Sequence, residues 1–252
     1  MKQQAIAAKR FGAAAQAYLS SSAHASGADL DRLRGLARQM GNPETLDLGC
    51  GAGHAAYALA GGGAQVTAYD LSAEMLAVVQ GEAAARGLDG IATRQGAAER
   101  LPFEDASFDL VVTRYSAHHW SYAPACLRSI RRVLRPGGRL VVIDSIAPEN
   151  PVADTLLQTI ELLRDPSHVR DYRVSEWGAM LEAAGFAAPE CDTWILDVEF
   201  GPWIDRQGAG ELRARAVLDV LAKGAEEARR QFDIQPDGSF KLPVAWLETV
   251  PV

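Results

Sequence analysis

The segment ETLDLGCGAG (residues 44–53) places three glycines, Gly49, Gly51 and Gly53, directly after a short apolar run. Glycine lets the backbone approach a ligand closely and adopt positive φ, and a helix that begins near His54 would point its free N–H groups at that ligand. The dinucleotide-binding pattern Gly-x-Gly-x-x-Gly requires glycine where this chain has His54. The turn is therefore either an ordinary tight turn or a cofactor site that fits a pyrophosphate poorly.

Asp70 ends the next predicted strand, VTAYD. An acid at the tip of that strand is placed to accept hydrogen bonds from both hydroxyls of a ribose. Alternatively it caps the helix at 72–86, a role that Ser72 could fill instead. The turn and the acid together indicate a cofactor that contains a nucleoside.

Short apolar runs alternate with helix-favouring stretches through most of the chain. This pattern predicts strands at 45–48, 64–69, 91–95, 108–114 and 138–145, with helices at 54–60, 72–86 and 124–134. Strands that alternate with crossover helices indicate an α/β, doubly wound, mostly parallel sheet, which binds ligands at the carboxyl ends of its strands.

The two ends of the chain differ from this pattern. Residues 1–28 look helical with a Ser-rich interruption, and a helix is predicted at 29–40. After residue 145 the pattern predicts helices at 152–164, 175–186 and 211–232, and strands at 194–200 and 239–250. We expect one compact domain with added helices.

Composition restricts the class of protein. The net charge of −7 argues against a nucleic-acid partner, and we interpret the basic run at 128–139 as a solvated helix that ends at Pro136. No apolar run could span a membrane, and the N-terminus does not resemble a secretory signal. Three widely spaced cysteines, Cys50, Cys126 and Cys191, show no metal-binding spacing and fit a reduced, cytoplasmic protein. We expect Cys50 and Cys191 to be small apolar fillers.

The chain resembles the class I S-adenosylmethionine-dependent methyltransferases, in particular the small-molecule branch that includes ubiquinone/menaquinone C-methyltransferases. Five segments carry the resemblance in the family's order: LDLGCGAG (46–53), YDLSAEML (69–76), GAAERLPFEDASFDLVV (96–112), SAHHW (116–120) and RRVLRPGGRLVVID (131–144). The resemblance implies a Rossmann-like sheet of seven strands with the last one antiparallel. It also implies a helical cap at 1–40, a cofactor-binding core at 41–145 and acceptor-covering segments with the last two strands at 146–252.

The resemblance assigns cofactor contacts by position. Gly49, Gly51 and Gly53 would approach the methionine portion, with backbone groups near Gly49 and Cys50 reading its amine and carboxylate, and Asp47 would orient the turn. Further contacts are expected of Asp70 with the ribose, of Leu71 and Met75 with the adenosine, of the Ala98 amide with the adenine, and of the Arg114 backbone with the cofactor. Many relatives carry an aspartate where this chain has Ala97; Glu99 or a main-chain carbonyl would then meet the adenine amino group.

Methyl transfer from a sulfonium requires the nucleophile to be close, aligned and dry, and a base only where the acceptor must lose a proton. The candidate catalytic residues are His118 and His119 after the fourth strand, His24 in a Ser-rich loop, and Tyr18, whose ring could face the sulfonium. Each has a plainer alternative: a structural or cofactor-shell role for the histidines, and helix packing for Tyr18. No metal is expected.

The polar segment at 164–173 lies where this fold covers the acceptor, so His168, Arg170 and Tyr172 are candidate acceptor contacts, with Arg170 able to hold an anion. A solvated loop is the alternative. Trp203 is either a pocket wall or core packing. We therefore predict methyl transfer from S-adenosylmethionine to a small molecule. The rivals are a non-catalytic S-adenosylmethionine-binding protein, a methyltransferase for RNA or protein, and a nicotinamide oxidoreductase.

Overall fold

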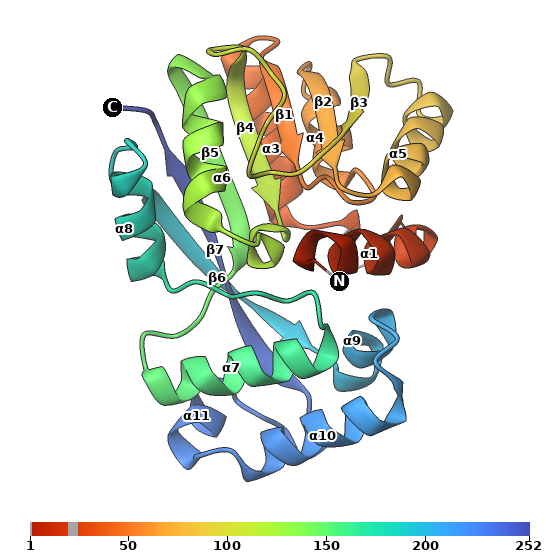
Figure 1. Cartoon of the computed structure of the whole chain (residues 1–252), viewed down its shortest axis with the longest axis vertical. Helices are drawn as coiled ribbons and strands as arrows, with labels where there is room; N and C mark the ends of the chain where they lie inside the picture. The colour runs from red at the N-terminus through yellow and green to blue at the C-terminus, as the bar shows by residue number, and fades with distance from the viewer. Residues whose placement is uncertain (1, 20–24) are drawn as a thin grey trace.

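The computed structural model of the chain describes residues 2–19 and 25–252, and the side chains of 2–12 and 25–252. Its centre is a sheet with the order β3-β2-β1-β4-β5-β7-β6 (Figure 1). The strands are β1 (Glu44–Leu48), β2 (Gln65–Asp70), β3 (Ile91–Gln95), β4 (Phe108–Arg114), β5 (Leu134–Ser145), β6 (Glu190–Val198) and β7 (Phe240–Thr249). Strands β1 to β5 pair in parallel and β7 runs antiparallel to both β5 and β6, so the predicted seven-stranded mixed sheet with an antiparallel last strand is confirmed.

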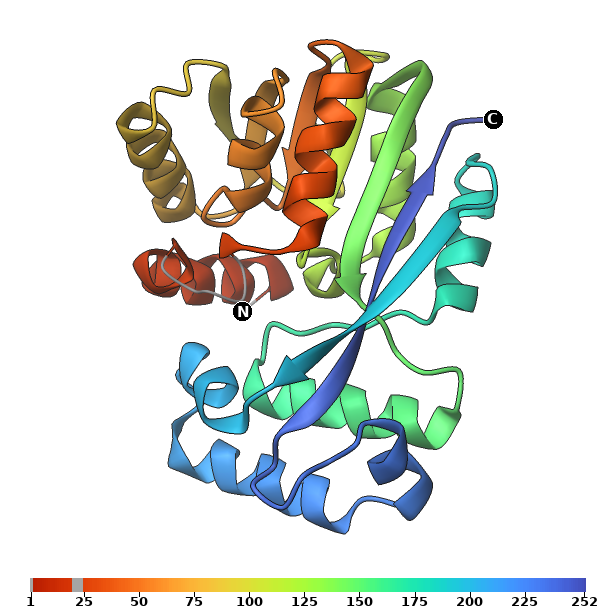
Figure 2. The same cartoon turned by 180° about the vertical axis from the view of Figure 1, so that it is seen from behind.

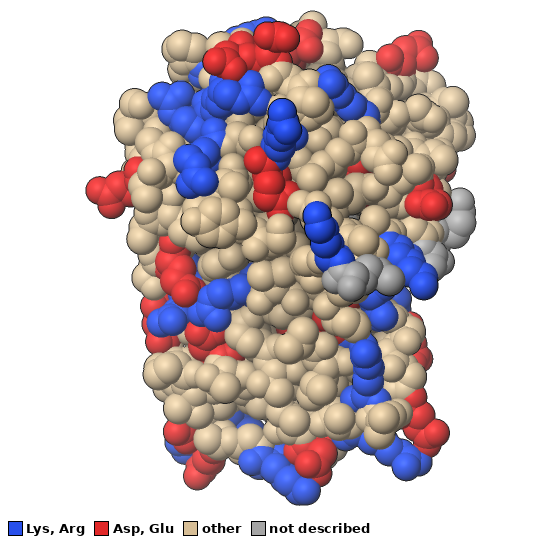
Figure 3. Space-filling model, in the orientation of Figure 1, with Lys and Arg blue, Asp and Glu red and all other residues tan. Residues whose placement is uncertain are grey.

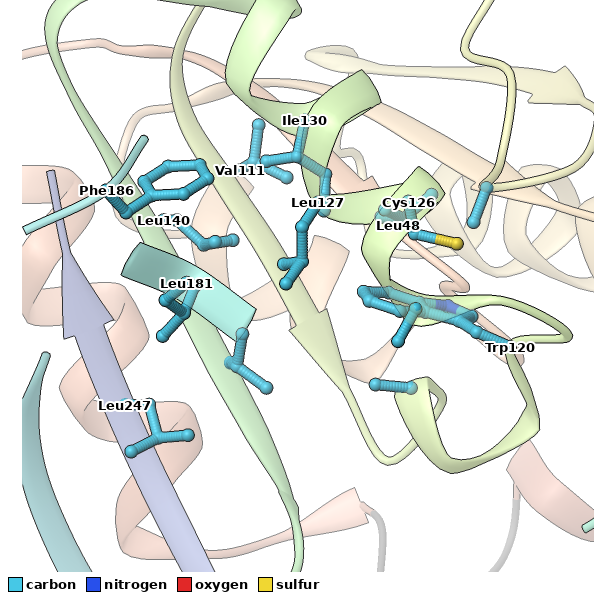
Figure 4. Packing of buried hydrophobic residues seen from close by; sticks show 14 of the residues in the cluster. Leu48, Val111, Trp120, Cys126, Leu127, Ile130, Leu140, Leu181, Phe186 and Leu247 are labelled. Carbon is cyan, nitrogen blue, oxygen red and sulfur yellow. The ribbon is translucent and has the colours of Figure 1, made fainter. Parts of the chain in front are cut away.

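Helices cover both faces of this sheet because its strands carry apolar residues on alternate sides. In β4, Val111 faces one layer of the core, while Leu110 and Val112 face the other. The Val111 layer packs against α6 (Ala123–Val133) and α8 (Val174–Ala183), through residues such as Leu127 and Leu181 (Figure 4). The other layer packs against α3 (Ala28–Met40), α4 (His54–Ala60) and α5 (Ala73–Ala85) (Figure 2).

A second lobe lies beyond the carboxyl ends of the parallel strands (Figures 1 and 2). It contains α7 (Pro151–Arg164), α9 (Phe200–Arg206), α10 (Gly210–Lys223) and α11 (Glu226–Gln231). The C-terminal part of β6 and the N-terminal part of β7 extend into this lobe. Its own apolar core includes Leu157, Trp203, Val217 and Phe240. Helix α1 (Gln3–Leu19) lies between this lobe and the sheet (Figure 1).

Three predicted elements were wrong in their limits. The helix at 211–232 is broken at Gly224, whose ψ of 154° is not helical, so that α10 ends at Lys223 and α11 begins at Glu226. The strand predicted at 194–200 begins earlier, at Glu190, and ends at Val198, before α9 starts at Phe200. The basic helix ends at Val133 rather than near Pro136, since residues 134–145 form β5.

The basic run of α6 and β5 is balanced by acids. Arg132 pairs with Asp105 and Arg135 with Asp109, and both signs of charge are interspersed on the face that Figure 3 shows. The apolar-filler interpretation was wrong for Cys191, which is an exposed residue of β6. Among the described residues, no helix combines the length and the apolar character needed to span a membrane.

Candidate functional site

The glycine turn joins β1 to α4 and is fixed to the end of β2. The amides of Gly49 and Cys50 both donate to the Tyr69 carbonyl, at 2.8 and 3.1 Å. Gly49 and Gly51 have φ of 71° and 51°, which favours glycine at both. A Cβ on Gly49 would lie 2.3 Å from Ser116 Oγ, whereas one on Gly51 would meet no atom of the described residues within 4 Å. Gly49 is therefore required by packing, and Gly51 leaves its backbone open to a ligand.

Asp70 holds the turn and the start of α5 together. Its Oδ2 accepts from the Gly51 amide and its Oδ1 from the Ser72 amide, both at 2.9 Å. The cap of α5 is Ser72, whose Oγ accepts from the Met75 amide at 3.2 Å. The alternative of Asp70 as the side-chain cap is thus wrong. Burial raises the pKa of Asp70, which the three nearby amides partly offset.

One cavity of about 610 Å³ begins at this turn and reaches the second lobe. Of the residues predicted from the sequence to bind the cofactor, those that line it are Asp47, Gly49, Cys50, Gly51, Asp70, Leu71, Met75, Ala98, Glu99 and Arg114. Gly53 lies behind them as the N-cap of α4, where a Cβ would be 2.7 Å from the Tyr57 ring. His118, His119 and Trp203 line the same cavity.

Asp47 is a buried carboxylate at the wall of the cavity. Only 1% of the residue is exposed, and neither oxygen has a well-aligned hydrogen-bond partner among the described residues. Burial raises its pKa to about 7, although the nearby Ala56 amide lowers it somewhat. Such a carboxylate suits a bound cation. No hydrogen bond to the turn supports the expected orienting role.

Two further cofactor-side residues are tied to neighbouring helices. Glu99 accepts from Gln4 of α1 at 2.8 Å and from the Ser121 amide at 3.2 Å, so this carboxylate holds α1 over the cavity. Arg114 forms an ion pair with Asp29 at 2.6 Å, in which both side chains are buried, and thereby fixes α3 beside β4.

The two histidines lie at the carboxyl end of β4, in a short 3-10 helix at Ala117–His119. His118 Nδ1 is 2.6 Å from Asp144 Oδ1, and His119 Nδ1 is 3.0 Å from the Ser167 carbonyl. Their ring centroids are 4.1 Å apart, and the edge of the Phe11 ring from α1 packs on His119.

The segment at 164–173 packs inside the protein, so the solvated-loop alternative was wrong. Its amides at Val169 and Arg170 donate to the His118 carbonyl, at 2.8 and 3.2 Å. The side chain of Arg170 pairs with Asp154 and Glu176, at 2.8 and 3.0 Å. The backbone of this segment thus helps to position the histidines through its hydrogen bonds to the His118 carbonyl.

The other predicted acceptor contacts of this segment point elsewhere. His168 is 6% exposed with Nε2 2.9 Å from Gln158 Oε1, and the Tyr172 ring packs on Trp177 at 5.4 Å. Neither residue, nor Arg170, is part of the cavity wall. Trp203 does line the cavity, with the Arg164 guanidinium 4.6 Å above its ring.

Comparison with known proteins agrees with this geometry. Residues 46–142 match the family model described as a methyltransferase domain. The chain is 45% identical over 183 residues to uncharacterized protein YafE of Escherichia coli (strain K12), covering 73% of this chain and 88% of that protein. It is 36% identical over 224 residues to uncharacterized methyltransferase YcgJ of Bacillus subtilis (strain 168), covering 89% and 88%. The crystal structure of YcgJ superposes with a TM-score of 0.81 at 34% identity, covering 87% of this chain and 98% of that one.

The chain belongs to the class I S-adenosylmethionine-dependent methyltransferases. The expected likeness to quinone methyltransferases is also found, since demethylmenaquinone methyltransferase of Chlorobaculum parvum is 36% identical over 115 residues, 45% of this chain and 46% of that protein.

Several wall residues of this methyltransferase were not predicted. Gln4 and Phe11 come from α1, and Glu161 and Arg164 form a buried ion pair at 2.9 Å on α7. The only sequence signal for that pair is the spacing of two opposite charges three residues apart within an apolar helix. Solvent-exposed ion pairs have the same spacing, so the sequence does not distinguish the buried pair from an exposed one. Of the remaining candidates, His24 and the side chain of Tyr18 lie outside the described residues.

Proposed function

We propose that this methyltransferase moves a methyl group from S-adenosylmethionine to a small-molecule acceptor by in-line displacement and releases S-adenosylhomocysteine. The observation that carries the proposal is one cavity whose wall includes the glycine turn and Asp70 together with His118, His119 and Trp203. Its volume of about 610 Å³ lies within the range of about 300–1,000 Å³ that is usual for small-molecule sites.

The chain's own residues fit the donor. Asp70 would accept from the ribose, and Leu71, Met75 and Ala98 offer an apolar surface for the adenosine. The unpartnered carboxylate of Asp47 would receive the ammonium of the methionine portion. When bound, S-adenosylmethionine supplies an activated methyl group, so the protein needs only to hold the acceptor in line and exclude water.

Helix α1 and the second lobe both contribute to the cavity wall, which disfavours a folded macromolecule as the acceptor. Helix α1 is hydrogen-bonded to Glu99 on one side and pairs with Asp165 through Arg10 on the other. Across from it, Leu196, Val198 and Leu242 of the lobe give the cavity an apolar wall. This shape favours a compact, partly apolar acceptor over RNA or a protein substrate. We place this activity in the cytoplasm, where three unpaired cysteines are stable.

The test is calorimetric titration with S-adenosylhomocysteine, with NAD in parallel. Binding of the former alone is expected; binding of NAD instead would overturn the proposal. Asp70→Ala should weaken S-adenosylhomocysteine binding about 10- to 100-fold, since a hydrogen bond to a charged group contributes about 1.5–3 kcal/mol. Asp89→Ala, which removes an exposed acid away from the cavity, is the matched control. Binding followed by no methyl transfer to any member of a broad metabolite panel would favour the non-catalytic alternative.

A further inference from the structure

His118 is held rigidly by one buried carboxylate. Asp144 is 2% exposed and lies on β5, beside the end of β4. Its Oδ1 is 2.6 Å from His118 Nδ1, and its Oδ2 accepts from the His118 amide at 3.2 Å. The Ser145 amide donates to Oδ1 as well, at 2.9 Å. Because Asp144 accepts from all three groups, Nδ1 carries a hydrogen, and Nε2 is the ring nitrogen left to the cavity.

Other elements around His118 add negative charge. Glu161 comes from α7, and Asp171 comes from the connection between α7 and α8. Burial lowers the pKa of His118, but Asp144 first, and then Asp171 and Glu161, outweigh it and raise that pKa to about 9. At neutral pH the ring is therefore an imidazolium, and its Nε2 is a charged N–H donor.

The neighbouring histidines stay neutral. His119 Nδ1 donates to the Ser167 carbonyl, which leaves the lone pair on Nε2. Burial, and then the charge of His118, lower the pKa of His119 to about 3, and the same two causes lower that of His168 to about 3. With this low pKa, His119 is a weak base. It is also a poor catalytic base, because the most effective catalytic base has a pKa near the working pH. Two adjacent histidines thus differ in charge, one cationic and one neutral, and their partners on other elements decide which is which.

We propose that His118, fixed by Asp144 as its positioning residue, binds the acceptor by donating from Nε2 to an oxygen that carries negative charge, and that this pair excludes amines. The inference rests on the proposed function, because it takes the histidine end of the cavity as the acceptor end. An amine would be held as a cation or would become one on methylation, beside an imidazolium in a buried site. An anionic oxygen instead gains a charge-assisted hydrogen bond.

An acceptor bound in this way requires no catalytic base. It arrives already deprotonated, so its electron pair forms the new bond to the methyl carbon. The carbon–sulfur bond breaks, its electrons go to the sulfur that becomes neutral, and no proton is released in the step. This agrees with the neutral, weakly basic state of His119.

The experiment uses 4-nitrophenol, whose phenolate has its own absorbance, added to protein saturated with S-adenosylhomocysteine at mildly acidic pH. We expect bound phenolate in the wild type, and no measurable binding of 4-nitrobenzylamine. His118→Gln should weaken phenolate binding about 10- to 100-fold, the usual range for a hydrogen bond to a charged group. Asp89→Ala, which changes an exposed residue that does not line the cavity, is the control, and it should leave phenolate binding unchanged.

The Asp144→Asn variant tests whether Asp144 positions and charges the His118 ring or only packs against it. Nuclear magnetic resonance titration of His118 should show its pKa falling below the wild-type value in this variant, while the His118→Gln protein still binds S-adenosylhomocysteine. Phenolate binding that survives His118→Gln, or amine binding equal to that of the phenol, would overturn the inference with the proposed function intact. If the wild-type protein does not bind S-adenosylhomocysteine at all, the proposed function itself is overturned.

Discussion

Replacing Asp47 by asparagine tests how the free protein holds a buried carboxylate for its cofactor. The pKa of this group is about 7 in the folded protein, against an ordinary value of 3.8. The folded protein therefore keeps a proton that the unfolded chain has lost across this interval. The stability that the protonated Asp47 contributes is fully present below pH 3.8, and this contribution is lost progressively as the pH rises to about 7.

The size of this effect follows from the interval. Each pH unit changes the free energy of unfolding by about 1.4 kcal/mol when the two states differ by one proton. The interval therefore corresponds to about 4 kcal/mol as an upper limit, and relaxation around the buried site makes about 2–4 kcal/mol the expected gain for Asp47→Asn above pH 7. Near pH 3.5 the variant and the wild type should have the same stability.

Urea denaturation at both pH values measures this difference, and calorimetry with S-adenosylhomocysteine measures its consequence. The variant should be more stable yet bind at least about tenfold more weakly, because the pair between carboxylate and ammonium is lost. Asp109→Asn is a control with the opposite sign, since Arg135 helps to hold the pKa of Asp109 below its ordinary value. Destabilisation by Asp47→Asn at neutral pH would show that the carboxylate is a structural acceptor and would refute the reasoning.

Two further substitutions test how the site is built. Gly51→Ala places a methyl group in the open cavity at a φ of 51°, so calorimetry should show weaker S-adenosylhomocysteine binding and denaturation a loss of about 1–2 kcal/mol; unchanged binding would mean that no ligand approaches this backbone. Arg114→Met leaves the buried carboxylate of Asp29 uncompensated and should cost about 3–5 kcal/mol in urea denaturation. Adding Asp29→Asn should restore part of that loss, and simple additivity of the two changes would contradict the proposed coupling.

The local sequence pattern was enough to predict the helices and strands of the core. The helix at 54–60 follows from its composition between the two glycine-rich turns, and the strands from short apolar runs, because periodicity is a property of neighbouring residues. The same local rule missed the break at Gly224, since the helix-favouring composition continues on both sides of it. It also left a solvated loop open as an alternative for the 164–173 segment, whereas the fold buries residues such as Asp165, Ser167 and His168.

The sequence by itself determined the family and the mixed sheet, and it predicted cofactor contacts at the turn and Asp70, because these belong to short, local motifs. The tertiary structure decided that Ser72 caps α5, that Asp47 has no well-aligned partner among the described residues, and that α1 and the lobe contribute to the cavity wall. It also decided that His118 is cationic and His119 neutral. Two adjacent residues of one type cannot be distinguished by their own pattern; their charges depend on Asp144 and Ser167, which only the folded chain brings beside them.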